Sequence, residues 1–535
     1  MSDRRVAVVT GGGAGIGAAI AEELGRRGDF VVTMDPLVTL DGVEQLPPAE
    51  ETTAGRIVAA GGAAQASAVS VTDREAVSEL FDGLVAEHGR LDAVINVAGI
   101  TRPTSFATGT EEDWAGVLAV HLEGYLNVLG AALPVMSAAG RGRILGVTSG
   151  SGWRPADAGA YACAKRAVAA LTWALGPVAP EGVAVNALSP IAVTRMVIEA
   201  ARRARERAAT GAAGPTSGGM SFGAMPQPHE LGPVAAHLVG DEVAWCRGRV
   251  VFAGGSEVAV VEPPRLLEVV RTGGVASLAT VLDAVVPRAF AEAEARQVSG
   301  GGSNPRFAGV FAEPPAVPQA NCGSCLIVSD RPALASALER ALGGRGVRSV
   351  RAEAVDSGFD GAARCLERAG PVDAVVVALA GTAGSSGEGG WEPVLAEHAG
   401  LPGQLLGDAA WARAVADHAT GAQRPMRLLV LTHAETEGGR SRAQAVAQLA
   451  RVGRSATDDR VAMFAVSHEA DDASGVSELA AHLVCAPEAT ALAGAELVAG
   501  SGWVGLRSHP RPAGSITLGG TDLPDWFDTT LRGML

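Results

Sequence analysis

The chain has 535 residues, of which 47% are hydrophobic, and its 58 acidic against 43 basic side chains give a formal net charge of −15 at pH 7. This length exceeds the usual size of one hydrophobic core, so we expect two domains. The negative charge disfavours nucleic acid and anionic membrane surfaces as partners, and no apolar run has the length of a signal peptide or membrane span, so we expect a cytoplasmic protein.

The first half alternates short apolar runs with alanine-rich helical patterns, which is typical of a parallel sheet covered by helices on both faces. Strands are predicted at 6–10, 30–34, 91–97, 143–148 and 182–188. The sequence TGGGAGIG begins at Thr10, where the first strand ends and a helical pattern begins. Glycines there allow a tight turn and close approach of a pyrophosphate, whose charge the helix N-terminus favours.

Asp35 follows the second predicted strand, about 18 residues beyond Gly17. A carboxylate at this position can accept hydrogen bonds from both hydroxyls of an adenosine ribose, and it repels a 2′-phosphate. The sequence therefore favours NAD(H) over NADP(H). The alternative interpretation is an acidic turn residue before Pro36.

Lys165 is the only lysine in the chain, and it stands four positions after Tyr161, one of only two tyrosines. In the helix predicted from 160 to 175, this spacing puts both side chains on one face. A free phenol has a pKa of about 10, and an adjacent cation lowers it towards the range of a general acid/base. The pair predicts proton transfer to or from a carbinol or carbonyl oxygen.

The segment from Arg195 to His229 interrupts the α/β rhythm with an arginine-rich helix and a Gly/Pro/Met-rich stretch, which favours a lid over the substrate. Its arginines could bind a phosphate or carboxylate, or could simply solvate a helix. A helix is predicted from about Arg265 to Gln297, and the stretch after it has the composition of an inter-domain linker.

The second half repeats the order of the first. The segments LERALGGRGVRSV, PVDAVVVALAG, WEPVLAEH and MRLLVLTH match four segments of the first half, which favours a duplicated domain, unless alanine-rich α/β units simply look alike. The glycine loop has no counterpart in VSDRPALA from Val328. Tyr161, Lys165 and Ser149 correspond to about Gly439, Ala443 and His433, so the second copy is predicted to be degenerate.

Residues 1 to about 260 resemble the short-chain dehydrogenase/reductase superfamily. The resemblance rests on TGGGAGIG at Thr10, NVAG at Asn96, VTSGS at Val147, YACAK at Tyr161 and NALSP at Asn186. It implies a Rossmann-like doubly wound sheet for each of the two tandem domains. We expect a catalytic domain at 1–262, a helix and linker at 263–321, a degenerate domain at 322–507 and a C-terminal tail at 508–535.

The resemblance also assigns roles to residues. Ser149 would orient the substrate oxygen, Tyr161 would exchange the proton, and Lys165 would hold the nicotinamide ribose. The remaining expected cofactor contacts are Gly11, Gly13, Gly15, Ile16, Gly17, Asp35, Val71, Asn96, Ala98, Gly99, Pro190, Ala192 and Thr194. No metal is expected.

Several positions depart from the family pattern. His121 stands where many members have an asparagine that supports a proton relay, so it would rebuild the relay or satisfy a helix bend. Ile191 replaces a common glycine, and Val71 would reach the adenine through its backbone because Ser70 replaces an aspartate. The interval from Ser149 to Tyr161 is one residue short, which makes Ser151 an alternative to Ser149.

Within the superfamily, VHLEG and SPIAVTRM are similar to the (3R)-hydroxyacyl-CoA dehydrogenase unit of multifunctional β-oxidation enzymes. We expect an NAD(H)-dependent oxidoreductase that interconverts a secondary alcohol and a ketone on a thioester-linked, polyketide or steroid-like substrate. The alternatives are a non-redox dehydratase or epimerase, and a nucleotide-sensing scaffold. The halves are expected to pair as an intrachain pseudo-dimer, and two chains as a homodimer.

Cys322 and Cys325 are the closest cysteine pair in the sequence, without a second pair or histidines at ligand spacing. We expect both to be structural, with a redox or metal role as the alternative.

Overall fold

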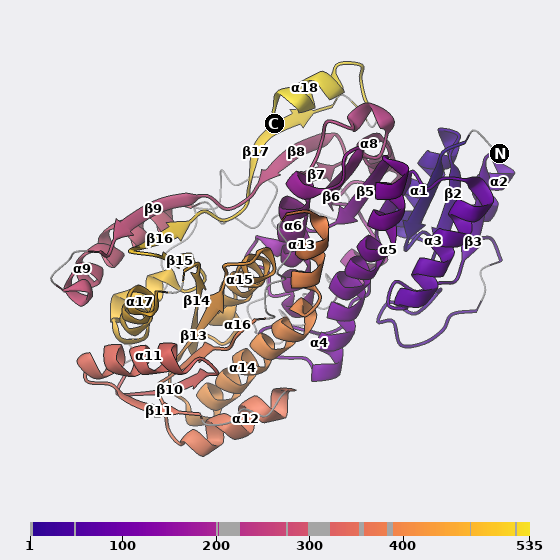
Figure 1. Cartoon of the computed structure of the whole chain (residues 1–535). Coiled ribbons are helices and arrows are strands. Elements are labelled where there is room, and N and C mark those ends of the chain that lie inside the picture. Colours follow the sequence, from indigo (N-terminus) through magenta and orange to yellow (C-terminus); the bar gives the residue numbers. More distant parts are fainter. Residues whose placement is uncertain are drawn as a thin grey trace.

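The computed structural model describes residues 4–47, 50–199, 202, 225–273, 277–297, 322–352, 358–381, 389–470, 472–518, 520 and 522–534. They form two α/β domains, each built around its own twisted sheet with helices on both faces (Figure 1). The predicted tandem Rossmann-like fold is confirmed. Most of the expected lid between Arg195 and His229 and the linker after Gln297 lie outside the described residues.

The first sheet has nine strands in the order β17-β8-β7-β6-β5-β4-β1-β2-β3. The strands from β3 to β7 are parallel, and β8 and β17 add two antiparallel strands at one edge. Their bounds are β1 Val6–Thr10, β2 Phe30–Met34, β3 Ala63–Ser67, β4 Ala93–Asn96, β5 Gly142–Val147, β6 Val183–Pro190, β7 Val250–Gly254, β8 Glu257–Glu262 and β17 Arg511–Thr517.

Helices cover both faces of this sheet. They are α1 Gly15–Arg26, α2 Thr53–Ala59, α3 Arg74–His88, α4 Glu111–Leu118, α5 Gly124–Ala139, α6 Gly159–Val178, α8 Gly232–Leu238 and α18 Phe527–Gly533, with a π-helical turn Ala119–Glu123 between α4 and α5 and short 3-10 turns Gly150–Gly152, Pro228–Leu231 and Asp241–Val243. Side chains alternate along β1: Val6 and Val8 enter the core beneath α3, α5 and α6, whereas Ala7 and Val9 enter the core beneath α1 and α8. Burial of both faces explains why these strands are continuous apolar runs.

The second sheet has eight strands in the order β11-β10-β12-β13-β14-β15-β16-β9. It repeats the first sheet strand for strand from β2 to β17, and the described residues contain no counterpart of β3. The bounds are β9 Leu266–Arg271, β10 Ser324–Ser329, β11 Arg348–Arg351, β12 Ala374–Ala378, β13 Met426–His433, β14 Val461–His468, β15 Glu496–Gly500 and β16 Trp503–Arg507.

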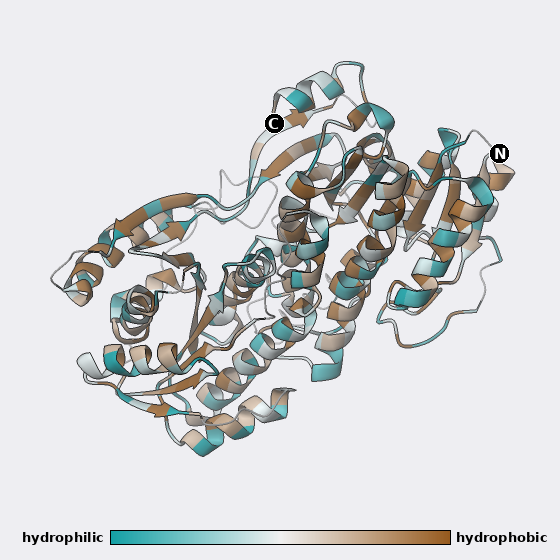
Figure 2. Ribbon diagram, in the orientation of Figure 1, coloured by the Kyte–Doolittle hydropathy of each residue, from teal (hydrophilic) through white to brown (hydrophobic). Residues whose placement is uncertain are grey.

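The helices of the second domain are α9 Leu278–Val285, α10 Ala291–Arg296, α11 Pro332–Gly344, α12 Gly358–Ala369, α13 Trp391–His398, α14 Leu401–Ala422, α15 Glu437–Ala450, α16 Gly453–Ala456 and α17 Ala473–Cys485, with a π-helical turn Val286–Phe290 and a 3-10 turn Pro487–Leu492. Figure 2 shows hydrophobic strands in both sheets and hydrophilic residues along outer helices such as α3. This is the pattern expected for α/β domains whose sheets are covered on both faces.

The two domains share one core. The helices α4, α5 and α6 of the first domain face α13, α14 and α15 of the second, with α6 directly against α15. A single cluster of buried side chains runs from the first sheet through these helices to the second sheet, and it includes Val8 and Leu171 from the first domain and Trp411 and Leu428 from the second. The halves are therefore packed as one body rather than joined only by a linker.

Two extended segments cross between the domains, which corrects two expectations. Residues 266–271, predicted to begin a helix, form β9 and pair antiparallel with β16 of the second sheet; the helix starts only at Leu278. Residues 511–517, expected in a C-terminal tail, form β17 and return to pair with β8 of the first sheet. At the crossing point the Ser508 amide donates to the Arg265 carbonyl (2.7 Å) and the Arg265 amide to the Ser508 hydroxyl (2.9 Å).

One helical run in the described part of the chain, Glu111–Ala139, is long and apolar enough to cross a membrane. It comprises α4, the π-helical turn and α5, and 56% of its apolar window is buried within the protein. This run packs against α3, α6, α13 and α14 inside the protein.

All six cysteines are free. The thiol of Cys322 contacts Cys485 of α17 rather than its sequence neighbour Cys325, which is fully buried in β10. The pair that the fold brings together could not be identified from spacing, because Cys485 lies 163 positions away in the sequence.

Candidate active site

The glycine loop between β1 and α1 has the backbone that a dinucleotide needs. Gly11 and Gly15 have positive φ angles of 64° and 57°, a conformation that favours glycine. A Cβ on Gly17 would lie 2.2 Å from the Gly11 carbonyl oxygen, so the loop and α1 can pack this closely only with glycine. At Gly15 the nearest side-chain atom is 3.9 Å from such a Cβ.

The N-terminus of α1 is open to a ligand. Its N-cap residue, Ala14, provides no side-chain hydrogen bond, so the first amides of the helix, which include those of Ile16 and Gly17, are not capped by a side chain. Uncapped amides and the positive end of the helix dipole suit a phosphate group. The loop therefore fits the pyrophosphate of a dinucleotide.

Asp35 lies where β2 ends, next to this loop. Its carboxylate accepts from the amide of Gly13 at 3.0 Å and from the amide of Leu37 at 2.9 Å. A Cβ on Gly13 would lie 2.7 Å from the same carboxylate. The two amides fix the orientation of Asp35, and this position matches that of a ribose-binding acid.

Asn96 is the last residue of β4, on the other side of β1 from β2, and Ala98 and Gly99 follow it. The Thr10 hydroxyl donates to the Asn96 side chain at 2.9 Å and accepts from the Ala98 amide at 3.1 Å. Gly11 packs so closely on Ala98 that a Cβ would come within 2.9 Å of it. The loop after β4 is thus tied to the glycine loop, on the side predicted to face adenosine.

Val71 is buried between β3 and α3, and its carbonyl accepts from the side chain of Asn127 at 3.0 Å. One lone pair of this carbonyl is therefore used within the protein.

Ser149 and Tyr161 come together at the carboxyl end of β5 and the start of α6. The Ser149 hydroxyl hydrogen bonds with the Tyr161 phenol. Burial raises the pKa of Tyr161, while this hydrogen bond and the charge of Arg154 act in the opposite direction. The sequence predicted a lowered pKa, and the difference arises from burial, which the residue pattern does not reveal.

Lys165 is 3% exposed and lies one helical turn after Tyr161. Its Nζ donates to the Val147 carbonyl at 2.6 Å and is 5.8 Å from the centre of the Tyr161 ring. Burial lowers the pKa of Lys165 to about 7. The amine of Lys165 thus lies near the Tyr161 ring and is close to its titration range at neutral pH.

His121 lies in the π-helical turn between α4 and α5, edge-on to the ring of Tyr161, with a centroid distance of 5.0 Å. Its Nε2 is 2.8 Å from the Ile100 carbonyl and 3.2 Å from the Ile100 amide. Burial and the neighbouring Lys165 lower the pKa of His121 to about 3, so the imidazole is neutral. His121 thus lies at a helix irregularity and beside Tyr161.

Pro190 is the last residue of β6, and Ala192 and Thr194 follow it. The Ile191 amide donates to the Ala253 carbonyl at 2.9 Å, which continues the pairing with β7 beyond Pro190. The Thr194 hydroxyl accepts from the Val197 amide at 3.3 Å, and its methyl carbon lies 3.9 Å from the place that a Cβ on Gly15 would take. This segment therefore faces the glycine loop across the expected cofactor cleft.

The sequence pattern did not identify Arg154 as a candidate site residue. It lies five residues after Ser149, and a Cβ on Gly150 would be 2.8 Å from its guanidinium. The guanidinium of Arg154 interacts electrostatically with the phenol of Tyr161. In a chain with 43 basic residues, a single arginine carries no signal, and only its place in the loop before Tyr161 could have marked it.

The equivalent position in the second domain has no room for a tyrosine side chain. A Cβ on Gly439, the counterpart of Tyr161, would lie 2.2 Å from the His433 carbonyl oxygen, so no side chain fits there. His398, in the place of His121, bonds to the hydroxyl of Ser441 at 2.7 Å. Arg442 forms a buried ion pair with Asp408. These contacts stabilise the second domain but offer no acid/base pair.

Residues 5–206 match the family model described as short chain dehydrogenase. The chain is 33% identical over 260 residues to the short-chain reductase protein NovJ of Streptomyces niveus, covering 48% of this chain and 94% of that protein. With the glycine loop and the assembled Ser149, Tyr161 and Lys165, this shows that the chain belongs to the short-chain dehydrogenase family. It is an oxidoreductase that acts on CH–OH groups with a nicotinamide cofactor.

Two other relatives bear on the substrate. The 3-oxoacyl-[acyl-carrier-protein] reductase FabG of Thermotoga maritima is 29% identical over 259 residues, which cover 48% of this chain and 98% of that protein. The peroxisomal hydratase-dehydrogenase-epimerase of Saccharomyces cerevisiae is 36% identical over 197 residues, which cover 36% of this chain and 21% of that protein. The second match agrees with the resemblance to a β-oxidation dehydrogenase unit.

One solved structure extends the likeness to both domains. The N-domain of a bacterial malonyl-CoA reductase, solved with NADP, superimposes with a TM-score of 0.61 at 17% identity, covering 90% of this chain and 95% of that one. The similarity is one of fold, and it includes the second domain.

Proposed function

We propose that the first domain uses NAD(H) to interconvert a secondary alcohol and a ketone, with a 3-hydroxyacyl or 3-oxoacyl thioester as the favoured substrate class. The observation that carries this proposal is the placement of Tyr161, hydrogen bonded to Ser149 and one turn from Lys165, across from the glycine loop. The printed names of FabG and of the β-oxidation relative support the acyl thioester.

The chain's own residues would handle the proton and orient the substrate. Ser149 holds the reacting oxygen by a hydrogen bond, and Tyr161 gives or takes its proton. Lys165 holds the ribose and, when charged, stabilises the phenolate. The pKa of His121 is lowered to about 3, so its imidazole would stay neutral and would not take up a proton from Lys165. The nicotinamide, when bound, supplies or accepts the hydride.

Asp35 supports NAD(H) as the cofactor. Its carboxylate is held by the amides of Gly13 and Leu37 and would face the adenosine ribose. A 2′-phosphate would meet this negative charge without a described arginine beside it in the loop.

Arg154 supports a narrower choice of substrate class. Among the described residues no carboxylate pairs with its guanidinium, which lies beside Gly150 and interacts with Tyr161. A cation in this place suits an acceptor oxygen near the reacting carbon, such as the thioester carbonyl of a 3-oxoacyl substrate or a free carboxylate. Arg154→Met should raise KM about tenfold or more, since a charged hydrogen bond is worth about 1.5–3 kcal/mol, while NADH affinity stays unchanged.

For assembly, we propose that the two domains form an intrachain pseudo-dimer through α4, α5 and α6 against α13, α14 and α15. A homodimer is also favoured, because the edge strand β9 exposes the apolar side chains Leu266, Leu267 and Val269. Light scattering of the purified protein tests the second part.

The decisive experiment follows NADH and NADPH absorbance with acetoacetyl-CoA, a cyclic polyketide-like ketone and a steroid ketone, each beside Tyr161→Phe and Asp35→Ala. We expect NADH oxidation with acetoacetyl-CoA that Tyr161→Phe abolishes without loss of NADH binding. Asp35→Ala should lower the preference for NADH over NADPH. Near wild-type turnover by Tyr161→Phe would remove it as the proton donor, and tight NADH binding without turnover on any substrate would favour a non-redox or sensing role.

A further inference from the structure

The loop that carries Ser149 and Arg154 is sandwiched between the two domains. On one side Gly152 rests on the backbone of α6, where a Cβ would lie 2.9 Å from the Arg166 amide nitrogen. On the other side stands α15 of the second domain. The short 3-10 turn Gly150–Gly152 and the residues that follow it are thus packed on both sides.

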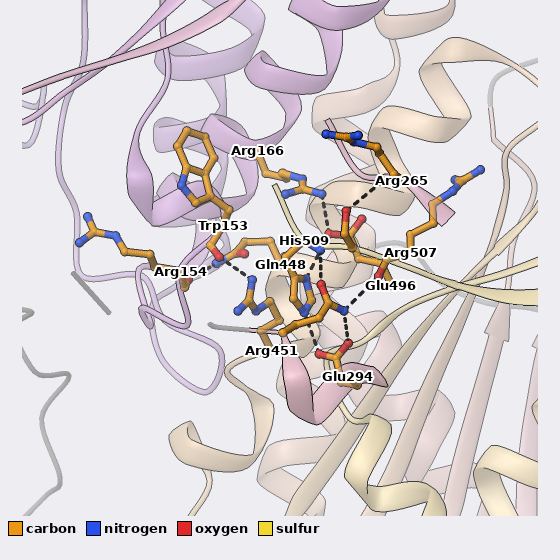
Figure 3. Close-up of polar contacts among 12 residues, drawn as sticks. Trp153, Arg154, Arg166, Arg265, Glu294, Gln448, Arg451, Glu496, Arg507 and His509 are labelled. Carbon is orange, nitrogen blue, oxygen red and sulfur yellow. Dashed lines mark hydrogen bonds and ion pairs between the residues drawn. The ribbon is translucent and has the colours of Figure 1, made fainter. Parts of the chain in front are cut away.

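Two side chains of α15 hold the backbone of this loop. The Gln448 amide nitrogen donates to the Ser151 carbonyl at 2.9 Å and to the Arg154 carbonyl at 2.7 Å. Arg451 donates from its guanidinium to the Trp153 carbonyl. Gln448 is only 2% exposed, so its hydrogen bonds compete little with water. In Figure 3 both side chains reach the loop backbone from one side, while the Arg154 guanidinium extends away from them.

The residues behind this contact are themselves fixed across the domain boundary. Arg166, the residue after Lys165, pairs with Glu496 of β15 at 2.6 Å, and both side chains are buried. Glu496 also faces His509, which bonds to Glu294 of α10 at 2.7 Å. Figure 3 shows this chain of polar contacts running from α6 into the second domain. The hydrogen bonds from Gln448 and Arg451 to the loop are therefore supported by buried polar contacts between the two domains.

We propose that the degenerate second domain is a positioning element for the active site, with Gln448 and Arg451 as positioning residues. By holding the carbonyls of Ser151, Trp153 and Arg154, they turn the Ser149 hydroxyl and the Arg154 guanidinium towards Tyr161. The second copy has lost its own acid/base pair but keeps the helix that shapes the substrate loop of the first. This rests on the proposed function only where turnover is the readout.

The test uses the full chain with Gln448→Glu, a nearly isosteric change that places a carboxylate against two carbonyls. The matched control is Gln444→Glu, one turn earlier on α15, which has no described bond to the loop. Hydrogen exchange of the backbone amides is measured for residues 149–154 and for the glycine loop. We expect about tenfold faster exchange in the 149–154 segment for Gln448→Glu, because the loop opens locally, and none in the glycine loop.

Turnover is the second readout. Gln448→Glu should lower kcat/KM by roughly 10- to 100-fold, since a displacement of about 1 Å in a reacting group has that effect, with NADH affinity within about twofold of wild type. Arg451→Met should act in the same direction, and Arg451→Lys, which keeps a donor, should restore part of the loss. Wild-type exchange in residues 149–154, or equal effects of Gln444→Glu, would overturn the proposal. Because exchange needs no substrate, a failure of the assigned reaction would leave that result in place.

Discussion

Lys165 combines two properties that are difficult to satisfy in one residue, since it is buried and is also a member of the proposed catalytic pair. Burial lowers its pKa from 10.5 to about 7, so the folded state binds its proton less tightly than the unfolded state. Below about pH 7 both states are protonated and the full cost of burying the charge opposes folding. Between about pH 7 and pH 10.5 the folded protein gives up the proton first, so this group makes stability rise with pH.

Lys165→Met keeps the length of the side chain and removes the charge. We expect the variant to be more stable than wild type at pH 6 by about 2 kcal/mol, because the Val147 hydrogen bond offsets part of the burial cost. The difference should shrink towards pH 10. Urea unfolding at pH 6, 8 and 10 measures it; a constant difference across this range would show that Lys165 is not buried as a titrating cation. Turnover should be lost at every pH.

At the level of elements, the C-terminal residues belong to the first domain. The strand β17 pairs with β8, and α18 buries Phe527 at 1% exposure, edge-on to His237 with ring centroids 5.3 Å apart. The neighbouring Trp526 is 48% exposed. A segment more than 240 residues away in the sequence thus completes the core beneath α8.

Phe527→Ala should destabilise the protein by about 3 kcal/mol, the usual effect of truncating a buried phenylalanine. Trp526→Ala, an adjacent aromatic truncation on the exposed side, is the control and should change stability by less than about 0.5 kcal/mol. Chemical denaturation followed by circular dichroism measures both. If both variants changed stability by a similar, small amount, residues 508–534 would not contribute to the core of the first domain.

The sequence predicts those strands, helices and loops whose residue pattern is set by neighbouring positions in the chain. Strands buried on both faces are continuous apolar runs, and the glycine loop and the Tyr161/Lys165 spacing are local as well. The partner of a strand is not a local property. Residues 266–271 read LLEVVR, without the apolar–polar alternation of a half-buried strand, and neither β9 nor β17 carries a sign that it pairs in the other domain. Arg154 and the raised pKa of Tyr161 were missed for the same reason, since both depend on burial.

At the scale of the whole molecule, the two domains share a core, exchange edge strands and bury the ion pair between Arg166 and Glu496. Chains of this length usually divide into domains that unfold separately. Here neither sheet can separate without exposing the apolar faces of α6 and α15. We therefore expect one cooperative unfolding transition for the full chain, with calorimetric and van't Hoff enthalpies that agree.

Cofactor binding provides the sharper test of this coupling. A ligand at 100 times its Kd stabilises the folded state by about 2.7 kcal/mol. If the domains unfold together, NADH bound at the glycine loop should slow hydrogen exchange by global unfolding equally in β1 and in β14, although β14 belongs to the domain without a cofactor site. The control is Asp35→Ala, which is expected to bind NADH more weakly. It should reduce the protection of β1 and of β14 in parallel. Protection confined to the first domain would mean that the shared core joins two units that still unfold independently.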